Sequence, residues 1–594
     1  MKQFALTFVA AFAAMMLFFL ALPFVLIGLV AASAGSSTPS VPSVAVIELD
    51  LRQGLTDQPD PSPFSVFGGG GLALIEVVQT LDRAAEDNRV KGLFVRLPEG
   101  GMTPAVADEL RQAFRRFRAS AKPIIIHSQG LMPSGAVIST YMLGASGSEF
   151  WMQENASFQA TGLAREELFF GRAFQRYGVR ADFEQRYEYK NAPNSFIQSD
   201  FTEAHREATV SWMTSVYETA IASAAQDRRQ EPAVLRAAIE GGPYGAAEAR
   251  AAGLIDRTGQ VTDAEAEILR RAGNNAQMIR YSDYVARERR RDSGRHTIAI
   301  VGGEGAIMTG RGSSDPFASG STIYSDTLAQ AIRDATRDSA VRAIVFRVSS
   351  PGGSDVASEQ ILAAVREAKA AGKPVVVSMG AYAASGGYWV SSEASAIVAQ
   401  PTTLTGSIGV FGGKFVLGDA LSRFGLDMRS VSVGGDYADA FDTSRPFDQA
   451  ERAAFSAWMD QVYETFVTRV SAGRNLPAAR VREIARGRVW TGAQARELGL
   501  VDELGGLYEA IARARVLAEI PEGDSVRYRY FPRQRSPFEA FGALFGGSSE
   551  TAETLIALNA FFSDPTVRAA LSEARTARLR SQGAVVLADE PLNP

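Results

Sequence analysis

The sequence contains the same pattern twice, and this internal repetition constrains the fold more than any other feature. The segment from Ala85 to Pro123 matches the segment from Thr336 to Pro374 at a constant offset of 251 residues. Further along, EARAAGLID (Glu248–Asp256) matches QARELGLVD (Gln494–Asp502) at an offset of 246 residues. Shared blocks of this length indicate a tandem duplication. The 594 residues therefore divide into two large domains of roughly 250 residues each.

Each repeat follows a pattern of strands and helices that predicts an α/β fold. Apolar runs such as Val44–Leu49 and Ala343–Val348 lack polar alternation. Helical segments separate these runs; the one at Ser325–Asp338 starts with a serine suited to N-capping, and the next spans Ser358–Ala371. Strands without polar alternation that are separated by helices indicate a buried, largely parallel sheet.

The N-terminus predicts a membrane anchor. No charged residue lies between Gln3 and Ile47, and Phe4–Ala32 is almost wholly apolar. A helix of this length, at about 1.5 Å per residue, exceeds a hydrocarbon core of roughly 30 Å. A cleavable signal usually has a shorter apolar region, although the small residues Ala32–Ala34 could serve as a cleavage site. Lys2 favours an inside N-terminus with the body on the outer side. A buried core helix is the alternative interpretation.

Composition excludes some classes of function. The net charge of −5 gives no global electrostatic case for binding nucleic acid. The basic run Arg287–Arg295 lies between the repeats and is typical of a solvated linker. Cysteine is absent, which rules out disulfides and thiol chemistry.

These observations predict six segments. They are a transmembrane anchor (1–32), a tether (33–43), a degenerate first repeat (44–283), a linker (284–296), a second repeat (297–526) and a C-terminal extension (527–594).

Chemistry-bearing motifs occur mainly in the second repeat. SPGGS (Ser350–Ser354), AASGGYW (Ala383–Trp389) and TGSIG (Thr405–Gly409) have only eroded counterparts in the first. Ser385 follows a predicted buried strand and precedes a plausible helix, whose first N–H groups favour developing negative charge. Glycines after the strand at Ser350 would leave backbone donors exposed toward an oxyanion. A serine among glycines is also common at tight turns, so spacing alone does not establish a nucleophile.

A nucleophilic serine needs a base, and the histidines are poor candidates. His296 lies in the predicted linker, and His205 in a helix that looks exposed. His127 ends a strand of the first repeat where Ser378 stands in the second, which favours a local structural role. A Ser-His-Asp triad remains open but has no support from the sequence.

Lysine usage indicates a different base. The chain has seven lysines against 54 arginines, and arginine stays protonated, whereas a desolvated lysine can lose its proton. Lys122 and Lys373 occupy equivalent positions before prolines, which indicates an architectural role. Lys190, in YEYKNAP of the first repeat, faces no lysine in the second. Elimination leaves Lys190 and Lys414 as candidates.

Together the motifs SPGGS, AASGGYW, TGSIG and YKNA, spread over two repeats behind an anchor, resemble the long, duplicated form of signal peptide peptidase A. The resemblance runs from the anchor to about Ile520. It implies two tandem Clp/crotonase-like domains and a serine–lysine dyad, with no metal or cofactor. Where that family often has YKSA, this chain has Asn191 after the lysine.

The resemblance also implies roles for individual residues. Ser385 matches the nucleophile, Lys190 the general base and Ser407 a serine that orients the lysine. The N–H groups of Gly353 and Gly386 match the oxyanion hole. Ser134 or Ser139 falls opposite Ser385 in the first repeat and is interpreted as a remnant.

The resemblance implies a serine endopeptidase in the bacterial inner membrane, single-pass, with its body on the periplasmic side. Its substrates would be apolar peptides, namely remnant signal peptides, and its assembly a homotetramer. Two alternatives remain at this point. A crotonase-like acyl-CoA enzyme would share the glycine loop, and a non-catalytic membrane scaffold would explain the decay of the first repeat.

Overall fold

The computed structural model describes residues 41–59, 71–288, 294–312 and 322–532, together with the backbone of residues 586–587. The predicted anchor (1–32) lies outside these ranges, as does most of the predicted tether. Within the described ranges, none of the helices is both long enough and apolar enough to cross a membrane.

The first repeat forms a six-stranded parallel sheet in the order β10-β6-β5-β4-β1-β11. Its apolar strands are buried, as the absence of polar alternation predicts. The strands are β1 (Ala45–Asp50), β4 (Val90–Arg96), β5 (Ile124–Ser128), β6 (Glu149–Met152), β10 (Arg257–Thr258) and β11 (Gln277–Arg280).

The second repeat forms an eight-stranded sheet with the path β21-β19-β17-β15-β12-β23, beside which β18 and β22 extend from β17. All pairs are parallel except β19 with β21. The strands are β12 (His296–Glu304), β15 (Val341–Ser350), β17 (Val375–Ala384), β18 (Ala396–Ala399), β19 (Leu404–Gly406), β21 (Val489–Thr491), β22 (Glu503–Leu504) and β23 (Val526–Phe531).

The two sheets share their central register. Leu93 pairs with Ile124 in the first, and Ile344 pairs with Val375 in the second. Each residue of the second pair lies 251 positions after its counterpart in the first pair, which is the offset between the repeats in the sequence. The predicted α/β class with a parallel sheet in each repeat is therefore confirmed.

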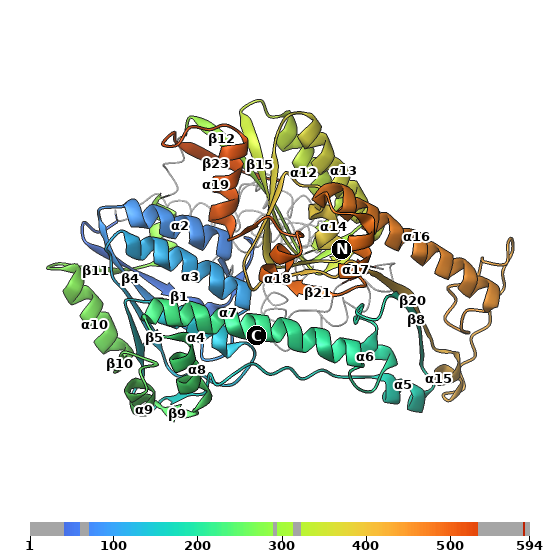
Figure 1. The fold of residues 1–594 in the computed structure, drawn as a ribbon, viewed down its shortest axis with the longest axis horizontal. Helices are drawn as coiled ribbons and strands as arrows, with labels where there is room; N and C mark the ends of the chain where they lie inside the picture. The colour runs from blue at the N-terminus through green and yellow to red at the C-terminus, as the bar shows by residue number, and fades with distance from the viewer. Residues whose placement is uncertain (1–40, 60–70, 289–293, 313–321, 533–585, 588–594) are drawn as a thin grey trace, which may run out of the picture.

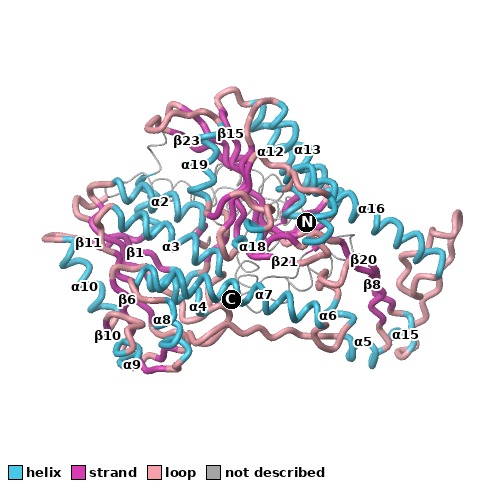
Figure 2. The backbone as a smooth tube through the Cα atoms, viewed as in Figure 1, coloured by secondary structure: helices cyan, strands magenta, loops and turns pink. Residues whose placement is uncertain are grey.

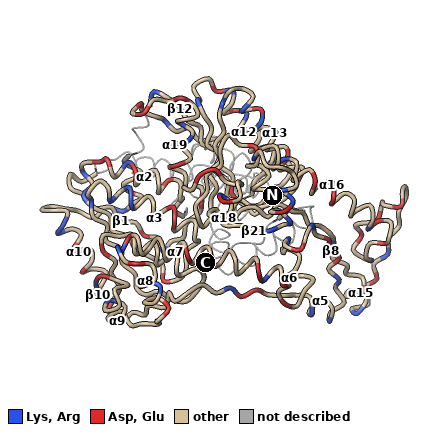
Figure 3. Tube along the Cα trace, in the orientation of Figure 1, with Lys and Arg blue, Asp and Glu red and all other residues tan. Residues whose placement is uncertain are grey.

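Helices cover both sheets and enclose one large apolar core in each repeat. Figures 1 and 2 show α2 and α3 side by side over the first sheet and α12 and α13 side by side over the second. The covering helices are α2 (Leu74–Glu86), α3 (Pro104–Ala119), α4 (Val137–Ala145), α10 (Val261–Ala272), α12 (Ser325–Arg337), α13 (Asp355–Ala370), α14 (Gly386–Ser391) and α19 (Leu507–Leu517). Acidic and basic residues are interspersed along both repeats (Figure 3).

Three local predictions differ from the structure. Ser325 is not an N-cap: β14 (Thr322–Tyr324) runs directly into α12, so Tyr324 takes the cap position in extended conformation. The second helix begins at Asp355, because the Ser354 side chain accepts a hydrogen bond from the Ala357 N–H. His205 is buried, 1 % exposed, because it packs edge-on against Phe201.

Two predicted boundaries fall inside elements. Helix α11 (Tyr281–Glu288) continues into the span predicted as a linker. Strand β23 pairs in parallel with β12 at the sheet edge, so residues as far as Phe531 belong to the second sheet rather than to a separate extension.

The repeats interlock through β8 (Arg180–Arg186) of the first and β20 (Val410–Val416) of the second, which pair antiparallel. Aromatic rings pack at this junction; the Phe183 and Phe415 centroids lie 5.1 Å apart. The long helices α7 (Glu203–Arg228) and α16 (Gln449–Arg474) both run toward this junction, α7 along the lower middle and α16 at the right of Figure 1. Ser215 of α7 hydrogen-bonds Thr491 of β21 at 2.7 Å between hydroxyl oxygens.

The remaining elements are short connections. They are η1 (Leu51–Gln53), β2 (Leu55–Thr56), β3 (Leu72–Ala73), β7 (Ser157–Phe158), α5 (Gly171–Tyr177), α6 (Asn194–Ile197), α8 (Pro232–Glu240), β9 (Tyr244–Gly245), α9 (Ala246–Ala251), β13 (Ala306–Met308), β16 (Gly352–Gly353), α15 (Gly418–Ser422), α17 (Ala478–Ile484), α18 (Gly492–Glu497) and β24 (Val586–Leu587).

A carboxyl group is partly buried where the first repeat meets β12. Glu304 accepts hydrogen bonds from the backbone N–H groups of Asp57 (3.3 Å) and Gln58 (3.2 Å). Burial, and secondly the charge of Asp57, raise the pKa of Glu304 to about 7. The native state therefore holds this proton more tightly than the unfolded state, and the associated stability is lost as the pH rises from about 4.5 to about 7.

We expect Glu304→Gln to remove this pH dependence, because glutamine does not titrate, although its amide nitrogen replaces one of the two accepting oxygens. The melting temperature of the variant relative to that of the wild type should therefore rise by several degrees between pH 5 and pH 8, an effect of about 1–3 kcal/mol. Thermal unfolding at both pH values measures it. The exposed Glu497, replaced by glutamine, is the control. An equal change at both pH values would contradict the assignment of the proton to Glu304.

Candidate active site

Ser385 occupies a strained turn between β17 and α14. Its backbone has φ 56° and ψ −119°, outside the regions that non-glycine residues normally adopt. The turn is held by the Ser385 N–H, which donates to the Gly406 carbonyl at 2.8 Å. It is also held by close packing, since a Cβ on Gly387 would stand 2.6 Å from the Ser350 carbonyl oxygen. Strain that its surroundings enforce is typical of functional sites.

Lys190 reaches this serine from the other repeat. A turn after β8 carries it, with the Lys190 N–H donating to the Tyr187 carbonyl at 3.1 Å. Lys190 Nζ lies 2.8 Å from Ser385 Oγ. The two side chains are buried, 1 % and 0 % exposed. The structure therefore brings together two residues 195 positions apart in the sequence.

Ser407 completes the surroundings of the lysine amine. Lys190 Nζ donates to Ser407 Oγ at 3.0 Å and to the Ser407 carbonyl at 3.1 Å. Ser407 itself has a positive φ of 48° and is held by its N–H, which donates to the Arg488 carbonyl at 2.7 Å. Both contacts come from one residue, so Ser407 fixes the direction in which the amine points.

The two glycines predicted for the oxyanion hole face each other. Gly353 has φ 156°, and a Cβ there would stand 2.0 Å from the Ile307 carbonyl oxygen, so no side chain fits. A Cβ on Gly386 would stand 3.0 Å from the Gly353 backbone nitrogen. The structure therefore places both backbones beside Ser385, on β16 and at the first residue of α14.

Comparison with known proteins identifies the family. The model of "Peptidase family S49" matches residues 116–274 and 367–521, one segment in each repeat. The chain belongs to peptidase family S49. "Protease 4" of Salmonella typhi is 33 % identical over 76 % of this chain and 73 % of its own length. "Protease 4" of Haemophilus influenzae is 29 % identical over 77 % of this chain and 75 % of its own length. "Serine protease SPPA, chloroplastic" of Arabidopsis thaliana is 29 % identical over 80 % of this chain and 70 % of its own length.

The resemblance to the duplicated signal peptide peptidase family is thereby confirmed, and the chain is a serine peptidase. The family match in both repeats agrees with the duplication read from the sequence. The Protease 4 relatives are matched over most of their length, so the two-repeat body is common to them and this chain.

The alternative bases lie elsewhere in this S49 peptidase. Lys414 Nζ donates to the carbonyls of Ala440 (2.5 Å) and Asp442 (2.9 Å). Burial lowers the pKa of His127, and its Nε2 donates to the Gly259 carbonyl at 3.1 Å within the first repeat. Lys122 and Lys373 both bind backbone carbonyls at equivalent positions, which confirms their architectural role.

Sequence reasoning missed one residue of the site. Gly487 has φ +83°, and a Cβ there would stand 2.5 Å from Lys190 Cβ and 2.5 Å from its backbone nitrogen. The Gly487 N–H donates to the Ile408 carbonyl at 2.9 Å. Gly487 thus lies between Lys190 and the loop that carries Ser407 and Ile408. A single glycine in RGRVW gives no signal of this contact in the sequence.

A segment near the C-terminus pairs with the glycine strand. Residues Val586 and Leu587 of β24 lie antiparallel to Gly353 and Gly352 of β16. An extended peptide approaching Ser385 along β16 would therefore compete with β24 for the same backbone positions.

Ending the chain after residue 585 is expected to lower KM for an extended peptide. If the pairing of β24 with β16 contributes about 1 kcal/mol of net hydrogen bonding, its removal should lower KM about fivefold. Steady-state kinetics on a fluorogenic peptide measures this effect. Ending the chain after residue 587 retains β24 and is the matched control. Equal KM values for the two truncated chains would show that β24 does not compete with substrate.

Proposed function

We propose that this S49 peptidase hydrolyses apolar peptides, foremost signal peptides left in the membrane after cleavage, with Ser385 as nucleophile and Lys190 as general base. The observation that carries the proposal is the buried contact of 2.8 Å between Lys190 Nζ and Ser385 Oγ, made across the two repeats. Burial disfavours the charged form of an amine, and only the neutral form can accept the serine proton.

The reaction proceeds through an acyl-enzyme. Lys190 takes the proton from Ser385 Oγ as the oxygen attacks the peptide carbonyl carbon. The C–N bond then breaks, and the amine product leaves with the proton from Lys190. A water molecule that Lys190 deprotonates attacks the ester, releasing the acid product and restoring Ser385.

Three further residues have roles in this proposal. The N–H groups of Gly353 and Gly386 stabilise the negative oxygen of the tetrahedral intermediate. Ser407 orients the amine through the two contacts it makes with Lys190 Nζ. No step calls for a metal or cofactor.

An apolar cluster next to the dyad supports apolar substrates. Ala192, Met308 and Phe411 are buried together. Ala192 is two residues from Lys190, and Met308 follows Ile307, which pairs with Gly353. This cluster makes the surroundings of the dyad apolar, and a charged substrate side chain entering there would lose its hydration without a partner.

We extend the proposal to location and assembly. The apolar segment Phe4–Ala32 would anchor the chain in the bacterial inner membrane, with the body on the periplasmic side. Exposed apolar residues support self-association into a homotetramer, since Val431 and Val433 are 95 % exposed and Phe424 is 81 % exposed. Light scattering of the detergent-solubilised chain tests the tetramer.

Substrate preference is tested with a matched peptide panel. The solubilised full chain should cleave a synthetic signal peptide at least about tenfold faster, in kcat/KM, than the same peptide with two apolar residues replaced by aspartate. Labelling by a fluorophosphonate that requires Ser385 establishes an active serine independently. A labelled enzyme without this preference would contradict the substrate class alone. Absence of both labelling and cleavage would favour a scaffold, and binding of coenzyme A would favour an acyl-CoA enzyme.

A further inference from the structure

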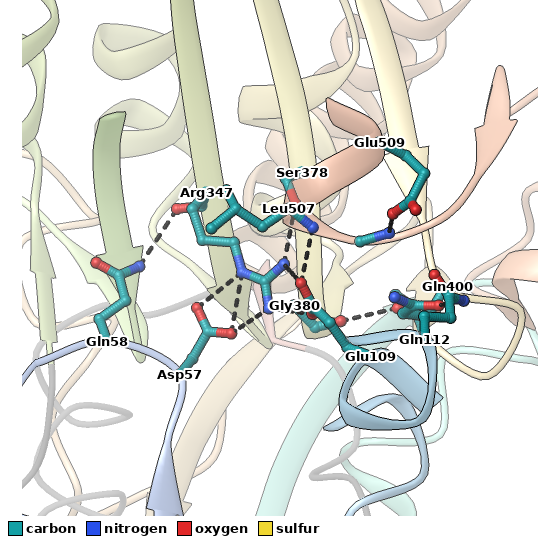
Figure 4. A network of polar contacts seen from close by, with 12 residues as sticks. Asp57, Gln58, Glu109, Gln112, Arg347, Ser378, Gly380, Gln400, Leu507 and Glu509 are labelled. Carbon is teal, nitrogen blue, oxygen red and sulfur yellow. Dashed lines mark hydrogen bonds and ion pairs between the residues drawn. The ribbon is translucent and has the colours of Figure 1, made fainter. Parts of the chain in front are cut away.

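A buried arginine joins the two repeats on a strand that leads toward the candidate active site. Arg347 of β15 is 0 % exposed. Its guanidinium contacts two carboxylates of the first repeat, Asp57 (Nε to Oδ1, 3.0 Å) and Glu109 (Nη2 to Oε2, 2.8 Å). Arg347 Nη1 also donates to Ser378 Oγ of β17 at 2.9 Å. Figure 4 shows the guanidinium between these three side chains.

The two carboxylates extend the contact to neighbouring strands and helices. Glu109 Oε1 accepts the backbone N–H of Leu507, the first residue of α19, at 2.7 Å. Asp57 lies directly against β17, since a Cβ on Gly380 would stand 2.9 Å from Asp57 Oδ1. The network therefore links the first repeat to β15, β17 and α19 at once.

The position of this network relates it to the dyad. Arg347 stands on the strand that continues through Ser350 to β16, which holds Gly353 of the proposed oxyanion hole. Ser378 stands on the strand that ends at Ala384, immediately before Ser385. Asp57 and Glu109 belong to the repeat that supplies Lys190. Arg347 and Ser378 thus belong to the repeat that carries the proposed nucleophile. The two carboxylates belong to the repeat that carries the proposed base.

We propose that Arg347 is a positioning residue that sets the docking of the two repeats, and through it the placement of Lys190 Nζ against Ser385 Oγ. The inference rests on the proposed catalytic dyad. A buried ion pair adds little net stability compared with apolar packing, but its hydrogen bonds are directional. An arginine that contacts two carboxylates fixes both distance and orientation between the repeats, which apolar contacts do not.

The duplication provides an internal control. Arg96 of β4 is the first-repeat counterpart, because it pairs with His127 as Arg347 pairs with Ser378. Arg96 donates to Gln129 of its own repeat at 3.1 Å. A substitution at Arg96 removes the same side chain from the same place in the sheet without touching the carboxylates Asp57 and Glu109.

The experiment compares kcat, KM, the pH profile of kcat/KM and the melting temperature of the solubilised full chain. Arg347→Met leaves Asp57 and Glu109 unpaired and is expected to destabilise the fold. The triple variant Arg347→Met/Asp57→Asn/Glu109→Gln removes all three charges and should regain most of the melting temperature. Its kcat should remain about 10–100-fold low, because a misplacement near 1 Å has this effect on rate.

The remaining readouts separate positioning from a purely structural role. The rising limb of the pH profile should move to higher pH in the triple variant, since a displaced Lys190 is better hydrated and keeps its proton longer. KM should stay within about threefold. Arg347→Lys keeps the positive charge but lacks the planar guanidinium, whose N–H groups point in fixed directions toward both carboxylates. The kcat of this variant should therefore also fall. Arg96→Met should retain the wild-type kcat and pH profile.

Several results would overturn this inference. They are a triple variant with wild-type kcat and pH profile, Arg347→Lys with wild-type kcat, or Arg96→Met impaired as much as Arg347→Met. Ser385→Ala, measured in parallel, keeps the two proposals apart. An active Ser385→Ala contradicts the dyad itself, whereas an inactive Ser385→Ala beside active Arg347 variants contradicts only the positioning role.

Discussion

Replacing Ser385 by alanine, or Lys190 by methionine, is expected to lower kcat at least about 1000-fold while KM changes little. In the proposed mechanism Ser385 Oγ forms the ester and Lys190 Nζ, which lies 2.8 Å from it, accepts its proton. Residues that act as one unit lose most of the rate when either is removed, so the double variant should be no slower than the slower single variant. Steady-state hydrolysis of a fluorogenic peptide measures all three.

The duplicated fold offers matched controls for this prediction. Ser139, one of the two first-repeat serines that align with Ser385 in the sequence, lies in α4 and is buried, so Ser139→Ala should keep kcat within about twofold. Lys414→Met tests the other lysine left by elimination. A Lys190→Met enzyme with wild-type kcat at neutral pH would show that another residue is the base. If Lys414→Met, measured in parallel, had a low kcat, that residue would be Lys414. Melting temperatures near that of the wild type exclude misfolding as the cause.

The sequence predicted the fold well because the duplication shows the same order of strands and helices twice. The strand Val341–Ser350 has no regular alternation of apolar and polar residues and is buried except at Arg342, and a parallel sheet is the usual way to bury a strand on both faces. Elimination reduced the seven lysines to Lys190 and Lys414, since arginine cannot act as a base, and the family resemblance then favoured Lys190. The glycine-flanked Ser385 stood out as a candidate, but its role and those of Gly353 and Gly386 were also implied by the resemblance.

What the sequence did not predict depends on how the repeats dock. Asp57 and Arg347 are 290 positions apart, and neither shows a local pattern that indicates a partner. His205 looked exposed because α7 has no strong apolar face in its sequence, yet the aromatic rings of Phe169 and Phe201 enclose it. Ser325 looked like a cap because N-cap preference is a local rule, and here the preceding strand overrides it.

Gly487 provides a sharper test of the geometry than removal of a reacting group. Gly487→Ala is expected to lower kcat by about 10–100-fold, because the new Cβ would stand 2.5 Å from Lys190 Cβ and 2.5 Å from its backbone nitrogen. Both neighbours are on or next to the backbone, so a side-chain rotation cannot relieve the clash. Lys190 must move away from Ser385, and a shift of about 1 Å has an effect of this size on rate.

The matched control separates this displacement from the cost of the backbone conformation. Gly372 has φ +77°, close to the +83° of Gly487, but a Cβ there meets nothing within 4 Å. The unfavourable φ of alanine costs a similar amount at either position, about 1–2 kcal/mol, and Gly487→Ala adds the clash with Lys190. Only Gly487→Ala should lose kcat. Equal losses in both variants would mean that strain is responsible, and wild-type kcat in Gly487→Ala would mean that the dyad tolerates a displaced lysine.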